Sequence, residues 1–389
     1  MKSTDLRAPF SAVARVLGLL LACSCALGTL AQGAPPVGGT MPNMGPMGSG
    51  GPMGAPQQAA RSEAHYPGGV TGILNIPYSE GMGSRPVLLD LYYNPDNHTP
   101  KPAVLWMHGG AFMAGNSRMS ISSFGPFDKV LAGIAARGYV AVGVNYRLSG
   151  EARFPAAVED VKAAVQWVRA NAAKYDIDPN RIAIWGESAG AYLAVEAGVS
   201  CGVKELEATG RNTKLSSCVQ AVIDWYGPID FPSMASQRSA NAGRQGPGGM
   251  QGPPPGMMQG GPGAGPMQGP GPGMMMGAGG SPEEAFLGCK YAECKADLLK
   301  LANPISFVGA NTPPFLIMHG DSDSMVPWKQ SQELYDALKT KGVPVQFKLL
   351  PGLNHMFGGA TADQTKEILK TVNDFLDTTF HLQQGAAKN

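Results

Sequence analysis

The chain has 389 residues, of which 43% are hydrophobic and 15% are charged, and its formal net charge at pH 7 is +1. This length allows one large domain or two ordinary ones, with enough apolar residues for a sizeable core. A near-neutral chain without a block of Lys and Arg lacks the charge that binding to a polyanion requires, which excludes a nucleic acid partner.

Residues 1–31 have the pattern of a signal peptide. Basic residues from Lys2 to Arg15 precede an apolar run that ends in small residues of the kind signal peptidase needs. The run of about 15 residues is short for a spanning helix of about 20, so we expect no stable membrane span. We therefore predict export to the periplasm or the extracellular space. A retained membrane anchor and a lipoprotein anchored through Cys23 are the alternatives.

Two low-complexity stretches divide the rest of the chain. Residues 33–60 and 241–280 consist mainly of Gly, Pro, Met and Gln, with almost no charge and no periodicity. Such segments bury too little apolar surface to offset their chain entropy, so both are predicted to be disordered. The expected organisation is a tether at 32–61, one folded domain at 62–382 that is interrupted by an insertion at 241–280, and a flexible tail at 383–389.

Strands and helices alternate through the predicted domain. Short apolar strands are expected at 88–93, 103–107, 140–144, 181–185, 219–226, 315–318 and 345–350. Helices are expected at 127–137, 155–175, 189–199, 328–341 and 362–378. In the second helix, valines from Val158 to Val168 recur at spacings of three and four, with Lys162 and Gln166 between them. This alternation predicts an α/β fold with a mostly parallel sheet and helices on both faces.

Gly-Glu-Ser-Ala-Gly at 186–190 lies between the predicted strand 181–185 and the predicted helix 189–199. Glycines on either side of a serine permit a tight turn that pushes the serine hydroxyl out of the sheet. The pentapeptide alone is a weak signal in a chain with 53 glycines, but its position between strand and helix is specific. We predict that Ser188 is a nucleophile.

A serine nucleophile needs a base and an acid that orients the base. In parallel sheets such residues lie beyond the carboxyl ends of the strands. His355 follows the last predicted strand and is the predicted base. Asp321 and Asp323 both follow the penultimate strand, and we assign Asp323 as the acid and Asp321 to capping the turn.

The predicted strand 103–107 leads into His-Gly-Gly-Ala-Phe-Met-Ala-Gly at 108–115. Backbone amides of glycines can approach a substrate oxygen without interference from side chains. The predicted oxyanion donors are therefore the amides of Gly109 and Gly110, together with that of Ala189 after the nucleophile. We expect His108 to brace this loop.

Four cysteines remain once the signal peptide is removed: Cys201, Cys218, Cys289 and Cys294. An even number in an exported chain indicates disulfides, and three connectivities are possible. We favour Cys201 with Cys218 and Cys289 with Cys294, because this pairing closes the shortest loops. No Cys and His set has the spacing of a zinc site, so no metal is predicted.

These motifs, with NYRLS at 145–149 and HGDSDSMVP at 319–327, resemble the α/β-hydrolase superfamily. The closest likeness is to bacterial carboxylesterases grouped with the bifunctional feruloyl and acetylxylan esterases (BD-FAE-like), near the hormone-sensitive-lipase-like enzymes. It covers about residues 65–235 and 282–380. The resemblance implies an α/β-hydrolase fold with a roughly eight-stranded sheet, no cofactor, and ester hydrolysis through an acyl-enzyme by the triad Ser188, Asp323 and His355.

The resemblance also implies a class of substrate, namely short acyl or aromatic acid esters, with plant polysaccharide esters among them. Many relatives have a third glycine where this chain has Ala111. An amide or peptide hydrolase of the prolyl-oligopeptidase or arylformamidase type would use the same residues, and is the first alternative. A non-catalytic binding protein on a hydrolase scaffold is the second. The oligomeric state and the role of the insertion stay open.

Overall fold

The computed structural model describes residues 60–79, 85–242 and 280–382. These residues all belong to one compact unit that spans Ala55–Asn389. The predicted signal peptide and tail lie outside the described residues, as do nearly all of the predicted tether and insertion.

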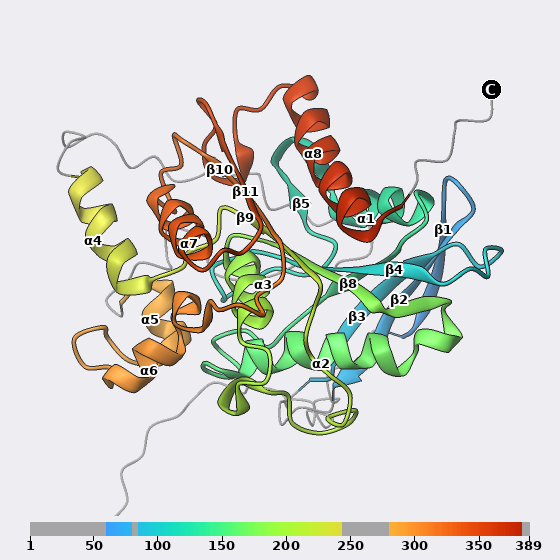
Figure 1. The fold of residues 1–389 in the computed structure, drawn as a ribbon, viewed down its shortest axis with the longest axis horizontal. Helices are drawn as coiled ribbons and strands as arrows, with labels where there is room; N and C mark the ends of the chain where they lie inside the picture. The colour runs from blue at the N-terminus through green and yellow to red at the C-terminus, as the bar shows by residue number, and fades with distance from the viewer. Residues whose placement is uncertain (1–59, 80–84, 243–279, 383–389) are drawn as a thin grey trace, which may run out of the picture. The chain divides into compact units, whose positions relative to one another are not determined.

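The described strands form one nine-stranded sheet in the order β1-β2-β3-β7-β4-β8-β9-β10-β11 (Figure 1). Neighbours from β7 to β11 pair in parallel, whereas β1, β2 and β3 pair antiparallel, as does β3 with β7. The strands are β1 (Ser62–Tyr66), β2 (Val70–Ser79), β3 (Val87–Tyr93), β4 (Lys101–Met107), β7 (Val140–Val144), β8 (Ile177–Glu187), β9 (Ala221–Trp225), β10 (Phe315–Gly320) and β11 (Val345–Leu350). A minor hairpin pairs β5 (Ser120–Ile121) with β6 (Gly125–Pro126).

The mostly parallel sheet agrees with the prediction, and all seven predicted strands are present. The sheet has one strand more than the eight that the resemblance implies. Both β1 and β2 were missed because β1 is largely exposed and β2 contains Gly, Asn and Pro, which strands disfavour. Their pairing with each other and with β3 compensates for this low propensity.

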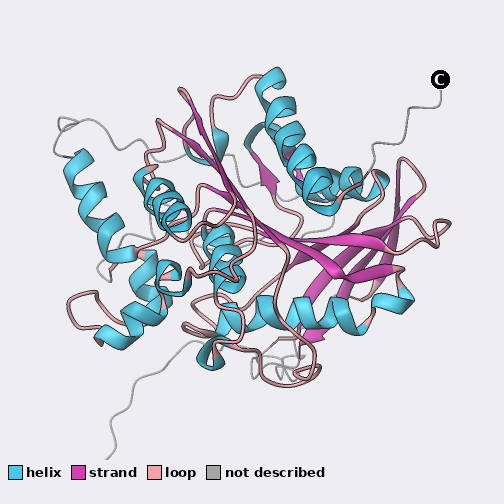
Figure 2. Ribbon diagram, in the orientation of Figure 1, coloured by secondary structure: helices cyan, strands magenta, loops and turns pink. Residues whose placement is uncertain are grey.

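All five predicted helices are present, and Figure 2 shows helices on both sides of the sheet. Side chains of α1 and α8 pack against one face, and those of α2, α3 and α7 against the other. The helices are α1 (Phe127–Ala136), α2 (Ala156–Ala170), α3 (Ala189–Val199), α4 (Phe231–Ala242), α5 (Pro282–Leu287), α6 (Ala296–Leu301), α7 (Lys329–Thr340) and α8 (Ala362–Phe380). Short 3-10 turns lie at Ser122–Phe124, Ala172–Lys174, Lys204–Leu206, Pro304–Phe307 (η5) and His355–Phe357 (η6).

Three tryptophans join the central strands on the face covered by α1 and α8. Trp106 of β4, Trp185 of β8 and Trp225 of β9 are fully buried. Their rings meet edge to face, with centroids 4.7–6.0 Å apart. Phe127 of α1 stacks on Trp106 at 3.8 Å. Edge-to-face contacts of this kind stabilise beyond the area that they bury, so they fix the strands that carry the loops described below.

The valine stripe of α2 is buried as its spacing predicts. Lys162 and Gln166 are buried too, although the amphipathic pattern favours the surface for them. The segment after α3 is the reason, because Lys162 Nζ donates to the Ser200 carbonyl at 2.6 Å and to Glu207 Oε1 at 2.9 Å. An ammonium group can be buried in a folded protein only when it has hydrogen-bond and ion-pair partners of this kind.

Both predicted disulfides are present. Cys201–Cys218 closes the segment that contains Glu207, one of the two partners of Lys162, and Cys289–Cys294 lies between α5 and α6. Disulfides are typical of an oxidising compartment. Among the described helices, none has the length and apolar character that crossing a bilayer demands.

Helix α3 lies directly against β4 at Gly190. A Cβ on Gly190 would lie 2.2 Å from the Met107 carbonyl oxygen and 2.4 Å from that of His108. Only glycine allows this approach, which brings the start of α3 close to the loop after β4.

We expect the two disulfides to differ in their contribution to stability. Replacing both Cys201 and Cys218 by Ser should lower the free energy of unfolding by about 3 kcal/mol. The same replacement of Cys289 and Cys294 should lower it by about 2 kcal/mol, because this pair closes the shorter loop. Urea unfolding under non-reducing conditions measures both. Unchanged stability without Cys201–Cys218 would contradict this expectation.

Gly190→Ala should lower the free energy of unfolding by about 2–3 kcal/mol, because its Cβ would overlap backbone oxygens that cannot move independently. Gly133→Ala is the matched control. Gly133 lies exposed in α1, and its added Cβ meets nothing within 4 Å. The free energy of unfolding of this control should rise by about 0.5–1 kcal/mol. Equal stabilities of the two variants in urea unfolding would argue against the tight contact.

Candidate active site

Ser188 lies alone in the turn between β8, which ends at Glu187, and α3, which begins at Ala189. Its φ of 51° and ψ of −121° are strained for a residue with a Cβ. The Ser188 amide donates to the Trp225 carbonyl at 2.9 Å and so fixes the turn to β9. A Cβ on Gly186 would lie 2.2 Å from the Gly190 carbonyl oxygen, so the turn needs its glycines. The serine is partly exposed between buried neighbours.

The structure brings Ser188, His355 and Asp323 together. His355 Nε2 lies 3.0 Å from Ser188 Oγ, and His355 Nδ1 lies 2.7 Å from Asp323 Oδ2. The three residues come from the turns after β8, β11 and β10, which meet at one edge of the sheet because the strands are parallel. The Asp323 side chain is fully buried, and that of His355 is 8% exposed.

Four groups surround the Asp323 carboxylate. Its Oδ1 accepts from the amides of Met325 and Val326 at 2.8 Å, and His319 Nε2 lies 3.3 Å from its Oδ2, which also faces His355. Burial raises the pKa of Asp323, but the charge of His355 and the hydrogen bonds from His319 and His355 outweigh it and lower the pKa well below its usual value. The carboxylate is therefore ionised at neutral pH.

Asp321, the competing acid, is directed elsewhere. It is exposed, and its Oδ1 accepts from the Gly352 amide at 2.7 Å, so it joins the turn after β10 to the turn after β11. This agrees with its predicted structural role.

His355 is held from several sides. Asn354 Oδ1 accepts from the amides of His355 and Ser324, which connects the loop after β11 to the loop after β10. The Tyr226 ring meets the imidazole edge to face at 4.9 Å. Burial lowers the pKa of His355, but Asp323 and then Glu187 raise it above its ordinary value against an opposing effect of Arg238.

The loop after β4 turns sharply, with positive φ at Gly110, Ala111 and Phe112. His108 braces it as predicted. Its Nδ1 lies 2.7 Å from the Gly109 carbonyl oxygen, its ring stacks on Tyr146 at 4.4 Å, and the Tyr146 hydroxyl donates to its carbonyl. Burial lowers the pKa of His108 to about 4, so this ring is neutral at pH 7.

One predicted oxyanion donor is wrong. The Gly109 amide donates to Glu187 Oε1 at 2.7 Å, so it is not available to a substrate oxygen. The amides of Gly110 and Ala189 donate to no acceptor within the described residues, and the same is true of Ala111. These three amides lie on the loop after β4 and at the start of α3.

Glu187 is the residue that the sequence reasoning missed. It is 1% exposed although it carries a carboxyl group, and it lies directly before Ser188. In the sequence it occupies the variable position of the pentapeptide, so the motif assigns it no role. The only available signal was a charged residue at the end of an otherwise apolar buried strand.

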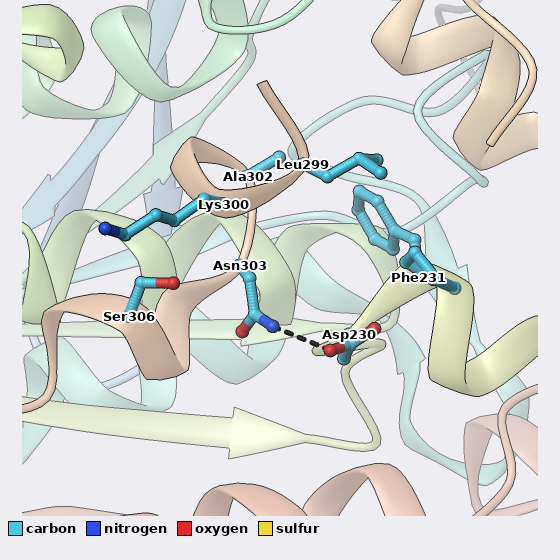
Figure 3. A pocket seen from close by; sticks show the side chains of 8 residues that line it. Asp230, Phe231, Leu299, Lys300, Ala302, Asn303 and Ser306 are labelled. Carbon is cyan, nitrogen blue, oxygen red and sulfur yellow. Dashed lines mark hydrogen bonds between the residues drawn. The ribbon is translucent and has the colours of Figure 1, made fainter. Parts of the chain in front are cut away.

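The described residues form a cavity that is lined by none of these side chains (Figure 3). It has a volume of about 310 Å³ and lies among the start of α4, α6 and η5, where Asn303 donates to Asp230 at 2.7 Å. No predicted site residue lines it, and we assign it no chemistry. Its lining consists of Asp230, Phe231, Pro232, Leu299, Lys300, Ala302, Asn303 and Ser306.

Curated relatives of the chain are named as esterases. The chain is 29% identical over 317 residues to esterase LipQ of Mycobacterium tuberculosis, a match that covers 81% of this chain and 64% of LipQ. It is 27% identical over 306 residues to esterase LipC of the same organism, with 77% and 64% covered. The chain thus spans about two thirds or less of the length of these relatives.

Solved structures of esterases have the same fold. A truncated carbohydrate esterase from gut microbiota is 28% identical, with a TM-score of 0.60, over 79% of this chain and 95% of that one. An acetyl ester-xyloside bifunctional hydrolase from Caldicellulosiruptor lactoaceticus is 21% identical, with a TM-score of 0.57, over 78% and 95%. The similarity to the hydrolase from Caldicellulosiruptor lactoaceticus shows the fold alone, because its sequence identity is low.

The sequence model of the BD-FAE family matches residues 89–253 and 272–338, which is more than half of the chain. The matched ranges contain Ser188 and Asp323, and end before His355. With the sheet order, the turn at Ser188 and the esterase folds above, this match gives the assignment: the chain has the α/β-hydrolase fold and belongs to the BD-FAE family.

Proposed function

We propose that this chain is an exported serine carboxylesterase that hydrolyses carboxylic esters through an acyl-enzyme on Ser188. The observation that carries the proposal is the hydrogen-bonded series from Ser188 Oγ through the His355 imidazole to the Asp323 carboxylate. A hydroxyl, a ring that can accept its proton and a buried anion behind that ring are the parts that acyl transfer needs.

In the first half of the reaction, Ser188 Oγ attacks the ester carbonyl carbon while His355 Nε2 takes the hydroxyl proton. Asp323 holds Nδ1–H and stabilises the imidazolium that forms. Negative charge then develops on the carbonyl oxygen. We assign its stabilisation to the amides of Ala189, Gly110 and Ala111, with Ala111 in the place first predicted for Gly109.

The tetrahedral intermediate collapses when the alcohol oxygen leaves with the proton from His355 Nε2. The acyl group stays on Ser188 as an ester. Water then attacks this ester with His355 again as the base, and the acid is released as Ser188 recovers its proton. Each proton that the imidazole takes is returned, so the enzyme ends in its starting state.

Short acyl esters and aromatic acid esters are the proposed substrates, with esters on plant polysaccharide among them. The support is the BD-FAE family match and the similarity to the carbohydrate esterase from gut microbiota, which is 28% identical. The two disulfides and the signal-like residues 1–31 support export to an oxidising compartment.

Hydrolysis of a panel of acetyl, butyryl, octanoyl and feruloyl esters and a peptide amide tests this proposal. We expect turnover of the acetyl or feruloyl ester, and a loss of at least about 10³-fold in kcat for Ser188→Ala. Ser236→Ala is the matched control, because the Ser236 hydroxyl in α4 bonds to the Pro232 carbonyl alone among the described groups. Its rates should equal those of the wild type. Turnover of the amide without the esters would favour a peptidase, and turnover that survives Ser188→Ala would exclude this mechanism.

The pH dependence of kcat/KM reports on the base. Only neutral imidazole can take the Ser188 proton, and the pKa of His355 is raised. Activity should therefore fall as the pH is lowered, with a midpoint above the ordinary histidine value of about 6.5. A rate that is constant from pH 5 to 8, measured with chemistry limiting, would rule out His355 as the base.

A further inference from the structure

We propose that Glu187 is a positioning residue for the reaction proposed above. It holds the loop after β4 through the Gly109 amide. Its carboxyl group, on the residue directly before Ser188, also favours the imidazolium form of the His355 ring to which the Ser188 hydroxyl bonds. This inference rests on the proposed esterase function, but no part of that function assigns a role to Glu187.

The contact with the loop is close and specific. Glu187 Oε1 accepts from the Gly109 amide at 2.7 Å, and both groups are buried. A Cβ on Gly109 would lie 2.3 Å from Oε1 and 2.7 Å from the carboxyl carbon. Any larger residue at 109 would therefore displace the carboxyl group. Glycine is needed here for this approach, not for an approach to a substrate.

Anchoring Gly109 has a consequence for the next residues. Gly110 and Ala111 follow directly and turn with positive φ, and their amides are free within the described residues. A hydrogen bond at the preceding residue limits where these two amides can point. Because oxyanion stabilisation depends on donors that are oriented beforehand, a loose loop would weaken the transition state more than substrate binding.

The electrostatic surroundings of Glu187 include few compensating charges. The titratable groups that act on it or respond to it are His355 of η6, Tyr226 after β9 and Tyr146 after β7. Burial raises its pKa, and His355, the Gly109 amide and Tyr226 oppose that rise without cancelling it. The other charged groups that shift the pKa of His355 are Asp323 and Arg238. Asp323 and Glu187 both raise the pKa of His355, so together they favour the imidazolium.

Glu196 in α3 provides a comparison within the same chain. It is as deeply buried as Glu187, but neither of its carboxyl oxygens has a hydrogen-bond partner among the described residues. Burial raises its pKa well above the ordinary value, against an opposing effect of Lys162. It bonds to no part of the loop after β4. Substitutions of Glu196 thus report the effect of altering a buried carboxyl group that has no part in positioning.

Two substitutions separate the two roles. Glu187→Gln keeps an acceptor for the Gly109 amide and removes the charge. Glu187→Met removes both the acceptor and the charge and keeps a side chain of similar size. We expect Glu187→Gln to keep kcat at the pH plateau within about fivefold and to move the acidic midpoint of kcat/KM down by about half a unit or more. We expect Glu187→Met to lose about 10²-fold in kcat, with KM changed by less than about threefold. Glu196→Gln and Glu196→Met should leave midpoint and kcat unchanged.

The outcomes are distinct. An unmoved midpoint in Glu187→Gln overturns the charge role, and a folded Glu187→Met with kcat within about threefold of the wild type overturns the anchoring role. Circular dichroism establishes folding, and if Glu187→Met does not fold, Gly109→Ala tests the same bond from the other side, with the same loss of kcat expected. Wild type that hydrolyses no ester and reacts with no fluorophosphonate would instead overturn the proposed function itself.

Discussion

The 2.7 Å contact between His355 Nδ1 and Asp323 Oδ2 is the interaction on which the rest of the site depends. It joins two loops that follow adjacent strands at one edge of the sheet, and it orients the ring toward Ser188. The fold prepares the contact by burying the carboxylate and giving it two backbone amides, which hold it ionised. Without this anion the imidazole would have neither a fixed orientation nor a counter-charge when protonated.

Close backbone packing supplies the second constraint. Gly190 brings the start of α3 against β4, and Gly186 allows the end of β8 to lie against the same helix start. The Ser188 amide bonds to β9, so Ser188 is held between the two neighbours of β8. On the face of the sheet opposite α3, the tryptophan rings of β4, β8 and β9 pack edge to face. The strain at Ser188 therefore persists because rigid contacts on both sides of the turn maintain it.

Much of this could be predicted from the sequence. Apolar runs located β4, β7, β9 and β10, which are buried and apolar along nearly their whole length. The order of motifs predicted that Ser188, Asp323 and His355 lie together, as they do in the structure. The failures have physical causes. Strands β1 and β2 are polar or irregular and form through pairing. Lys162 is buried by a loop whose path the helical pattern does not encode. Glycine at 109 was assigned to substrate binding, whereas its amide faces Glu187, a contact between residues 78 positions apart.

Trapping the nucleophile tests the central claim most directly. Full-length protein is treated with a fluorophosphonate, its intact mass is measured, and the modified peptide is mapped. The account predicts one adduct per chain, located on Ser188, with activity lost in proportion to labelling and with labelling slowed by orders of magnitude in His355→Ala. An adduct on another residue, or full activity after Ser188 is completely modified, would contradict it.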